Sequence, residues 1–381
     1  MSSTMFWAEV DADGRLVLSP DVAARFRLTP GSRLAFSQNG GGLRLHRPVS
    51  QLTKIYIEPS SLCNLDCRTC IRNVWDEPLD IMTQATFDRI MAGLAEFSPP
   101  PTIFFGGLGE PLTHPSLVDW VATAKAAGAR AELITNGTML TERMSRRLIE
   151  AGLDVLWVSL DGATPESYAD VRLGASLPKV LANIRQFNAL RPNRHDPAPE
   201  LGLAFVAMQR NIADLPAIMD IAKQVGASRL SVSNVLPYTA NMESEILYAR
   251  VLNNSTRQPS KYAPHLSLPK MNPNSQLGQL LGQIMERGWV LNFAGGGLAA
   301  SNTCPFIEDG TLAIGWDGSV SPCLPLLHNH SNVLDERRRV SRRYIVGNVA
   351  DQSLPHIWTL PEHVAFRQKV QAFDFAPCVF C

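Results

Sequence analysis

Six short apolar segments alternate with amphipathic stretches between residues 54 and 235, and this alternation restricts the fold more than any other feature. The intervening stretches have apolar residues at helical spacing. Strands that alternate with helices predict an α/β fold with a parallel sheet and right-handed crossovers. Six units suit either an open doubly wound sheet or a partial (β/α)6 barrel. The predicted strands are Lys54–Glu58, Thr102–Phe105, Ala131–Thr135, Val155–Asp161, Leu201–Ala207 and Leu230–Val235.

Residues at the expected helix ends support this interpretation. Thr83 and Thr141 precede two amphipathic stretches, where a threonine hydroxyl can accept a hydrogen bond from the first helical turn. Gly128, Gly152 and Gly226 follow such stretches, at the position where glycine commonly ends a helix. In α/β folds ligands bind beyond the carboxyl ends of the strands. We therefore expect functional residues directly after the strands.

The flanking regions have different patterns. The first of them is β-rich and has Asp-Gly and Asn-Gly-Gly-Gly turns, whereas the last contains a hairpin that turns at Asp317-Gly318. The predicted parts are a small β-rich domain (1–48), the α/β core (51–240), an irregular linker (241–300) and a compact C-terminal domain (301–381).

Charge and hydropathy exclude some classes of partner. Lys and Arg total 35, and Asp and Glu also total 35, so the formal net charge is zero. This balance gives no electrostatic case for nucleic acid or a membrane surface as the partner. The N-terminal stretch has no secretory pattern, and no apolar run approaches the roughly 20 residues of a spanning helix. We expect a cytoplasmic protein.

The seven cysteines fall into two groups that are more than two hundred residues apart. An odd number of cysteines in a cytoplasmic chain is a poor basis for disulfides, whereas clustered thiolates favour zinc or iron–sulfur centres. The pattern indicates two metal sites, one with three ligands and one with four. The groups are Cys63, Cys67 and Cys70, and Cys304, Cys323, Cys378 and Cys381.

Three cysteines in the sequence CNLDCRTC suit a [4Fe–4S] cluster, because one iron then has no protein ligand and is left for a small molecule. A zinc ion needs a fourth ligand. Asp66 and Asp76 are nearby but poorly placed for that role.

The C-x3-C-x2-C motif after the first strand resembles that of the radical S-adenosylmethionine (radical SAM) superfamily. By this resemblance Cys63, Cys67 and Cys70 hold the SAM-binding cluster. The segment FFGGLGEPL resembles the family's glycine-glycine-glutamate segment. It would bring backbone groups and a carboxylate to the methionine ammonium of SAM, and its residues are Gly106, Gly107, Gly109 and Glu110.

Further matches follow in the family's order over roughly 180 residues. ITNG and VSLDG resemble segments that reach the ribose or the methionyl group, through Asn136, Ser159 and Asp161. Arg172 resembles the arginine that binds the methionine carboxylate. The candidates near adenine are Met208 and Asn211. One departure is Thr69, which stands where many members carry an aromatic residue.

The resemblance implies reductive cleavage of SAM and hydrogen abstraction from a substrate by the 5′-deoxyadenosyl radical. It implies ferredoxin or flavodoxin as electron donor. A barrel with an open side suits a peptide or protein substrate.

The C-terminal domain resembles the short twitch form of the SPASM domain, which carries an auxiliary [4Fe–4S] cluster. Cys304, Cys323, Cys378 and Cys381 would ligate it. A four-cysteine zinc site is the alternative, and the segment GNVADQSLPHIW favours the iron–sulfur assignment. Two nearby histidines, His328 and His330, are interpreted as loop residues rather than ligands.

Residues 1–48 resemble an AbrB-type swapped-hairpin unit, which implies dimerisation or substrate docking. The whole chain resembles the maturases associated with tungsten-containing aldehyde ferredoxin oxidoreductases, which act on a protein or its tungstopterin cofactor. Two alternatives remain. One is an enzyme that modifies a ribosomally made peptide, and the other is a non-catalytic iron–sulfur regulator that binds DNA through residues 1–48.

Overall fold

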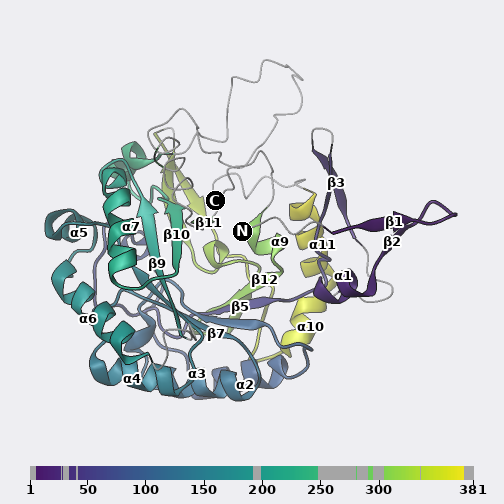
Figure 1. Cartoon of the computed structure of the whole chain (residues 1–381), viewed down its shortest axis with the longest axis horizontal. Helices are drawn as coiled ribbons and strands as arrows, with labels where there is room; N and C mark the ends of the chain where they lie inside the picture. The colour runs from purple at the N-terminus through teal and green to yellow at the C-terminus, as the bar shows by residue number, and fades with distance from the viewer. Residues whose placement is uncertain are drawn as a thin grey trace.

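A curved sheet with helices along its outer face forms the body of the molecule (Figure 1). The computed structural model describes residues 6–26, 28, 34–39, 42–191, 199–247, 280, 291–294, 304–334 and 336–372. Within these residues ten strands form one sheet, in the order β11-β10-β9-β8-β7-β6-β5-β12-β13-β16. Its six central strands are parallel and match the predicted ones to within two residues at each end. They are β5 (Lys54–Ile57), β6 (Thr102–Phe105), β7 (Ala131–Thr135), β8 (Val155–Ser159), β9 (Glu200–Ala207) and β10 (Arg229–Asn234).

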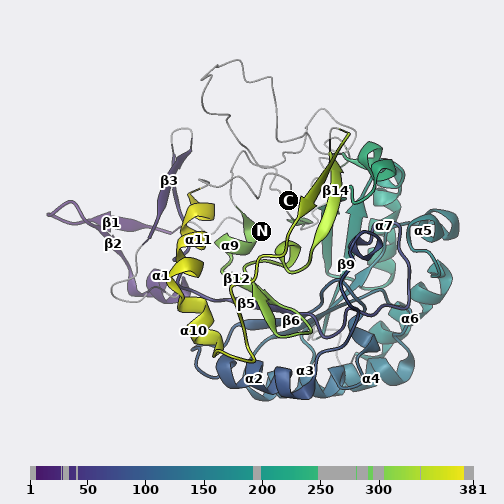
Figure 2. The same cartoon turned by 180° about the vertical axis from the view of Figure 1, so that it is seen from behind.

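The predicted partial barrel is confirmed. Figures 1 and 2 show the helices of the central region on the convex side of the sheet. Within the described residues, no helix combines the length and apolar character needed to span a membrane. The helices are α2 (Gln84–Leu94), α3 (Leu117–Ala126), α4 (Glu142–Glu150), α5 (Pro165–Val171), α6 (Leu177–Leu190) and α7 (Leu215–Gln224).

The helix ends obey the local signals in the sequence. Thr83 Oγ1 accepts a hydrogen bond from Thr86 N at 3.1 Å, and Thr141 Oγ1 accepts one from Met144 N at 3.3 Å. Gly128, Gly152 and Gly226 end α3, α4 and α7 with φ values of +78°, +81° and +72°. Positive φ is accessible to glycine without the steric cost that a Cβ atom imposes. These predictions are therefore confirmed.

Large apolar side chains fix the helices against the sheet. Phe87 of α2 stacks on Trp120 of α3, with ring centroids 4.4 Å apart and an interplanar angle of 5°. Both rings are buried, and Trp120 Nε1 donates to Gln84 Oε1 at 2.7 Å. Each such buried ring stabilises the fold by roughly 1.5–3 kcal/mol through removal from water. These contacts hold α2 and α3 together against the sheet.

The C-terminal domain continues the sheet of the core. β12 (Thr311–Ile314) pairs in parallel with β5 and turns at Gly318, where φ is +80°, into antiparallel β13 (Ser319–Ser321). This confirms the predicted hairpin, although its union with the core sheet was not predicted. The remaining elements are η5 (Leu324–Leu326), β14 (His330–Leu334), β15 (Arg337–Ser341), β16 (Gly347–Asn348), α10 (Leu354–Thr359) and α11 (Pro361–Gln371).

The stretch between core and C-terminal domain contains a strand that the sequence did not indicate. β11 (Leu291–Ala294) pairs in parallel with β10 and lies inside the predicted linker 241–300. It forms one edge of the described sheet, and β16 forms the other. α9 (Pro305–Glu308) follows it in the chain.

The N-terminal unit projects from the side of the body, as Figures 1 and 2 both show. It consists of two antiparallel hairpins and one short helix, and Gly14, with φ of +77°, makes the first turn. His46 joins it to the C-terminal domain, with its Nδ1 2.9 Å from Glu308 Oε2. Its elements are β1 (Ala8–Val10), β2 (Leu16–Leu18), α1 (Pro20–Arg25), β3 (Phe36–Asn39) and β4 (Gly42–Leu45).

Candidate active site

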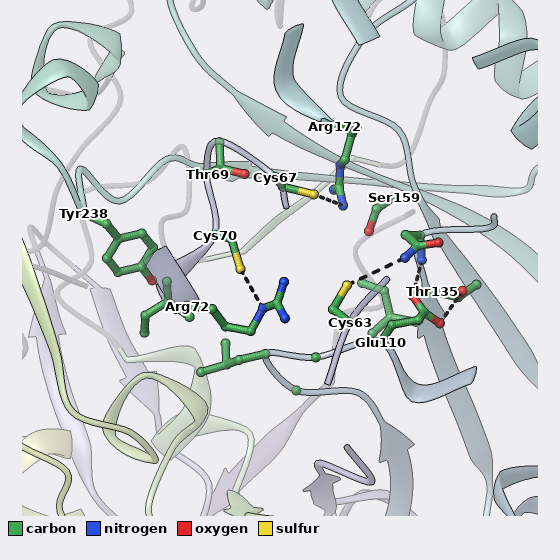
Figure 3. A pocket seen from close by; sticks show the side chains of 16 residues that line it. Cys63, Cys67, Thr69, Cys70, Arg72, Glu110, Thr135, Ser159, Arg172 and Tyr238 are labelled. Atoms are coloured by element: carbon green, nitrogen blue, oxygen red, sulfur yellow. Dashed lines mark hydrogen bonds between the residues drawn. The ribbon is translucent and has the colours of Figure 1, made fainter. Parts of the chain in front are cut away.

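A cavity of about 220 Å³ opens at the carboxyl ends of the strands (Figure 3). Most of the predicted site residues line it, including all three cysteines of the first group. The lining residues are Cys63, Cys67, Thr69, Cys70, Ile71, Arg72, Gly107, Leu108, Gly109, Glu110, Ile134, Thr135, Asn136, Ser159, Arg172 and Tyr238. The topology explains this convergence, because β5, β6, β7 and β8 all end at this edge of the sheet.

The cysteine loop is held by the end of α5. Arg68 N donates to Val171 O at 3.0 Å. The Arg68 guanidinium also forms an ion pair with Asp170, with Nη2 2.9 Å from Oδ1. A short helix, η1 (Ile71–Asn73), begins directly after Cys70. These contacts fix a loop that has no regular secondary structure of its own.

Each cysteine thiol faces at least one hydrogen-bond donor. Leu65 N lies 3.4 Å from Cys63 Sγ. Arg172 Nη1 lies 3.9 Å from Cys67 Sγ, and Arg72 Nε lies 3.4 Å from Cys70 Sγ (Figure 3).

These donors act against the effect of burial. Burial raises the pKa of Cys63 and of Cys67, and the positive charges of Arg72 and Arg172 act in the opposite direction. Thiols must deprotonate to bind a metal. The arginines therefore favour the thiolate form that a metal centre needs.

No group of three or more His, Cys, Asp or Glu side chains within the described part of the chain is arranged around one metal ion. Cysteines that ligate an iron–sulfur cluster each bind a different iron.

The glycines of the FFGGLGEPL segment are required by packing of the protein on itself. A Cβ atom on Gly107 would lie 2.6 Å from Glu58 Cγ, and one on Gly109 would lie 2.2 Å from Ser60 O. Gly106 does not line the cavity, and a Cβ atom there would lie 2.5 Å from the Phe104 ring. The glycines thus let this loop lie directly on the backbone that precedes Cys63.

Glu110 is buried at the cavity wall and organises the neighbouring loops. Its Oε1 accepts hydrogen bonds from Leu112 N at 3.1 Å and Thr135 Oγ1 at 2.7 Å. Its Oε2 accepts from Asn136 N at 2.8 Å. Burial raises the pKa of Glu110, against the opposing effects of these bonds and of Arg172. A carboxylate has about four acceptor positions, so one remains toward the cavity.

Asp161 lies behind the cavity rather than on its wall. It is fully buried, and its Oδ2 accepts from Arg172 Nε at 2.6 Å. Its Oδ1 accepts from Val206 N at 2.7 Å. Both oxygens are engaged with the protein, so Asp161 orients Arg172, whose Nη1 faces Cys67 in Figure 3.

The other predicted contacts divide between the wall and the interior. Asn136 lines the cavity and ties it to the cysteine loop, because its Nδ2 donates to Asn64 Oδ1 at 2.9 Å. Ser159 lines it at the end of β8. Met208 is buried away from it, and Asn211 Oδ1 accepts from Met208 N at 2.8 Å.

Sequence reasoning missed Arg72 and Tyr238. Arg72 is only two residues beyond Cys70, and a basic residue this close to a cysteine ligand was a signal in the sequence. Its Nε is a donor to Cys70 Sγ in the structure. Tyr238 follows β10 and lines the same cavity as Thr69 (Figure 3). Nothing local in the sequence identifies it.

The second cysteine group is described in part. Cys323 is buried and precedes η5, and Cys304 precedes α9. Burial raises the pKa of Cys304, and the backbone N–H groups of Ile307 and Phe306 oppose that rise. Cys378 and Cys381 lie outside the described residues.

The interpretation of the two histidines as loop residues is wrong for His330 and incomplete for His328. His330 is buried and begins β14. His328 lies in a loop, but it is buried between two carboxylates, Glu58 and Glu77. Neither contact was visible in the sequence, because Glu58 is 270 residues away from His328.

Comparison with protein families gives two matches. The model of the radical SAM superfamily matches residues 57–195. The model of SPASM, an iron–sulfur cluster-binding domain, matches residues 304–381.

Related chains carry different functional names. A "tungsten-containing aldehyde ferredoxin oxidoreductase cofactor-modifying protein" from Pyrococcus furiosus is 29% identical over 328 residues, which is 86% of each chain. A "PqqA peptide cyclase" from Gluconobacter oxydans is 27% identical and covers 72% of this chain and 77% of its own length.

Solved structures show the same fold. Streptococcus suis SuiB bound to S-adenosylmethionine has a TM-score of 0.57 and 14% identity, with coverage of 87% of this chain and 72% of its own. Native anSMEcpe with bound AdoMet and the Cp18Cys peptide has a TM-score of 0.55 and 19% identity, with coverage of 84% of this chain and 83% of its own.

Proposed function

This chain is a radical SAM enzyme with a C-terminal SPASM domain, and we propose that it matures a tungsten-containing oxidoreductase by modifying that enzyme or its cofactor. The three-cysteine loop beside Glu110 and Arg172 in one cavity supports the radical SAM chemistry of this proposal, and the Pyrococcus furiosus relative supports its substrate. Iron–sulfur clusters and SAM are its cofactors, as the sequence predicted.

The residues of the cavity fit these cofactors. Cys63, Cys67 and Cys70 would hold a [4Fe–4S] cluster that, with SAM bound and an electron supplied, yields a 5′-deoxyadenosyl radical able to abstract hydrogen. Three soft thiolates, of which Cys67 and Cys70 face arginine side chains, suit such a cluster. The electron donor would be a ferredoxin or a flavodoxin.

The protein's own share is to bind and orient SAM. The remaining acceptor position of Glu110 would take the methionine ammonium, and that positive charge would compensate a carboxylate whose burial is costly. The Nη groups of Arg172 would take the methionine carboxylate, in an orientation fixed by Asp161. Asn136 and Ser159 would contact the ribose or the methionyl group. Thus two opposite charges in one wall match the zwitterionic end of SAM.

The auxiliary cluster would be held by Cys304, Cys323, Cys378 and Cys381. Two four-iron clusters predict about eight irons and eight sulfides per chain. Iron and sulfide analysis of protein reconstituted without oxygen tests this ligand set. Zinc in place of the second cluster would contradict it.

The assignment of the substrate rests on the Pyrococcus furiosus relative, which matches most of both chains. The test is to incubate the reconstituted enzyme, SAM and dithionite with a tungsten oxidoreductase produced without its maturase. We expect a mass change in the oxidoreductase or its cofactor and a gain of its activity. The matched Cys67→Ala enzyme should give neither. Unchanged mass and activity with the active enzyme would refute this substrate.

A second candidate is modification of a ribosomally made peptide, which the PqqA peptide cyclase relative favours. Under this alternative the chain should bind a short precursor peptide in isothermal titration and should leave the tungsten enzyme unchanged. The same incubation with both substrates separates the two candidates.

The N-terminal unit supports a homodimer through residues 1–48. Its hairpins expose apolar side chains, with 79% of Trp7, 67% of Val10 and 77% of Leu43 accessible. A two-stranded hairpin is at best marginally stable alone, and an exposed apolar surface of this kind favours association. Light scattering should give a dimer for the full chain and a monomer when residues 1–48 are deleted. A monomeric full chain would contradict this.

A further inference from the structure

Three ionisable side chains, of which Glu58 and His328 are buried and Glu77 is partly buried, form a continuous chain beneath the SAM-binding loop. His328 Nε2 lies 2.7 Å from Glu58 Oε2, and His328 Nδ1 lies 2.6 Å from Glu77 Oε2. Glu58 is 0% exposed and His328 is 4% exposed. Each residue comes from a different segment. Glu58 follows β5, Glu77 follows the cysteine loop, and His328 belongs to the SPASM domain.

The geometry determines the charge of His328. Both of its ring nitrogens face carboxylate oxygens, and only the imidazolium ion can donate from both nitrogens. Burial acts to lower the pKa of His328, but the hydrogen bonds and charges of Glu58 and Glu77 outweigh it, and the pKa is raised. The chain is therefore a cation held between two anions.

One end of this chain fixes the SAM-binding loop. Glu58 Oε1 accepts a hydrogen bond from Leu108 N at 3.0 Å. Gly107 lies so close that a Cβ atom there would be 2.9 Å from the same Glu58 oxygen. Gly107 and Leu108 both line the cavity, and Glu110 follows two residues later. The position of the Glu58 carboxylate therefore decides where this wall of the cavity stands.

The other end lies in the SPASM domain. Glu77 Oε1 accepts from Asn329 N at 2.6 Å, and Arg343 Nη1 lies 3.7 Å from Glu77 Oε2. Arg343 Nη2 lies 3.0 Å from Asp317 Oδ2, at the turn between β12 and β13. Alternating charges thus run from the backbone of Leu108 to the hairpin of the SPASM domain.

We propose that His328 is a positioning residue through which the SPASM domain holds the Gly107–Glu110 loop in the conformation that binds SAM. A buried ion pair is weak evidence for a contribution to stability, because desolvation offsets its attraction. Its location, one hydrogen bond from a cavity wall, points to orientation of that wall instead. The inference rests on the proposed function, because it takes SAM as the ligand of this loop.

The test compares two buried histidines that each pair with glutamate. His328→Gln removes the double contact at the loop. His46→Gln is the matched control, because His46 is buried and pairs with Glu308 away from the cavity. Both variants are reconstituted without oxygen, and SAM binding is measured by isothermal titration. The electron paramagnetic resonance spectrum of the reduced first cluster is recorded with and without SAM.

We expect His328→Gln to keep its iron content and to bind SAM about 10- to 100-fold more weakly, as is typical of lost outer-shell contacts. The spectral change on adding SAM should need correspondingly more SAM. His46→Gln should bind SAM as the wild type does. Glu77→Gln, which keeps the side-chain shape, should weaken SAM binding in the same direction and serves if His328→Gln does not fold.

Wild-type SAM affinity in whichever of His328→Gln and Glu77→Gln folds would overturn the proposal, as would an equal loss in His46→Gln. Failure of the proposed function gives a different result, because then the wild-type protein itself would bind no SAM.

Discussion

The two cysteine sites differ in what surrounds them. The three-cysteine loop borders an open cavity and faces the guanidinium groups of Arg72 and Arg172. Cys304 of the second group instead packs among the apolar side chains of Ile307, Leu326, Phe366 and Val370. A site that takes a ligand needs space and charged partners, whereas a site that only holds a cluster needs enclosure. The first site therefore has the space and the charges that a ligand needs, whereas the described surroundings of Cys304 are apolar.

Their electrostatics differ in the same sense. At the first site arginine charges lower the pKa of the thiols that burial raises. Carboxylates raise the thiol pKa at both sites, but at Cys304 the opposing groups that follow burial are the backbone N–H groups of Ile307 and Phe306 rather than arginines. Positive and negative charges near an iron–sulfur cluster shift its reduction potential in opposite directions.

The largest difference in activity between the two sites is expected from the variants Cys67→Ala and Cys323→Ala. Cys67→Ala should abolish formation of 5′-deoxyadenosine, because it removes a ligand of the SAM-binding cluster. Cys323→Ala should keep SAM cleavage and lose turnover of the protein substrate. Each variant should fall from about eight irons per chain to about four. Iron analysis and chromatography of the nucleoside products provide the measurements.

Equal loss of SAM cleavage in both variants would contradict the assignment of different roles to the two clusters. Intact cleavage in Cys67→Ala would refute the assignment of the first cluster.

Removal of the Glu110 charge should have the next largest effect, which is a loss of SAM affinity. Glu110→Gln loses one charge-assisted hydrogen bond to the SAM ammonium, worth about 1.5–3 kcal/mol, so SAM should bind roughly 10- to 100-fold more weakly. Isothermal titration measures this. Glu142→Gln, at an exposed pair with Arg146, is the control and should change nothing. Unaltered SAM affinity in Glu110→Gln would exclude this carboxylate as the ammonium partner.

Arg72→Gln should have a smaller effect that is confined to the first site. The variant loses the donor that lies 3.4 Å from Cys70 Sγ. Its first cluster should have a more negative reduction potential, and SAM cleavage should fall by about tenfold. Redox titration followed by electron paramagnetic resonance measures both clusters in one sample. A shift in the second cluster alone would contradict the assignment of Arg72.

The smallest expected effect is the pH dependence of the link between the domains. The folded pKa of His328 is raised, so its ion pairs contribute fully below the unfolded pKa of about 6.5 and are lost as pH rises through the folded pKa. The difference in Tm between wild type and His328→Gln should therefore narrow as pH rises above neutral. Burial lowers the pKa of the neighbouring His330, and the charge of His328 acts in the same direction, so His330 titrates below this pH range. Calorimetry across this range measures it, and a gap that widens with pH would contradict the assigned charge.

The features that the sequence revealed are those with a local or regular pattern. The strand β6 and the helix starts at Thr83 and Thr141 depend on neighbouring residues, and they were predicted almost to the residue. The cysteine loop and Glu110 were recognisable because each belongs to a short motif of consecutive residues, CNLDCRTC and FFGGLGEPL.

The features that the sequence did not reveal are long-range contacts. His328 meets Glu58 across 270 residues, and β12 joins the sheet beside β5 only in the folded chain. Asp161 resembled a ligand of SAM, yet its two oxygens are engaged with Arg172 and Val206. Composition and spacing carry no information about which partners a buried carboxylate meets in the folded chain.

Anaerobic incubation of the reconstituted chain with SAM and dithionite tests the central claim most directly. The open three-cysteine site predicts 5′-deoxyadenosine together with methionine, and no such product from Cys67→Ala. Absence of 5′-deoxyadenosine from a chain that carries its full iron and sulfide would contradict the assignment of this cavity as the site of SAM cleavage.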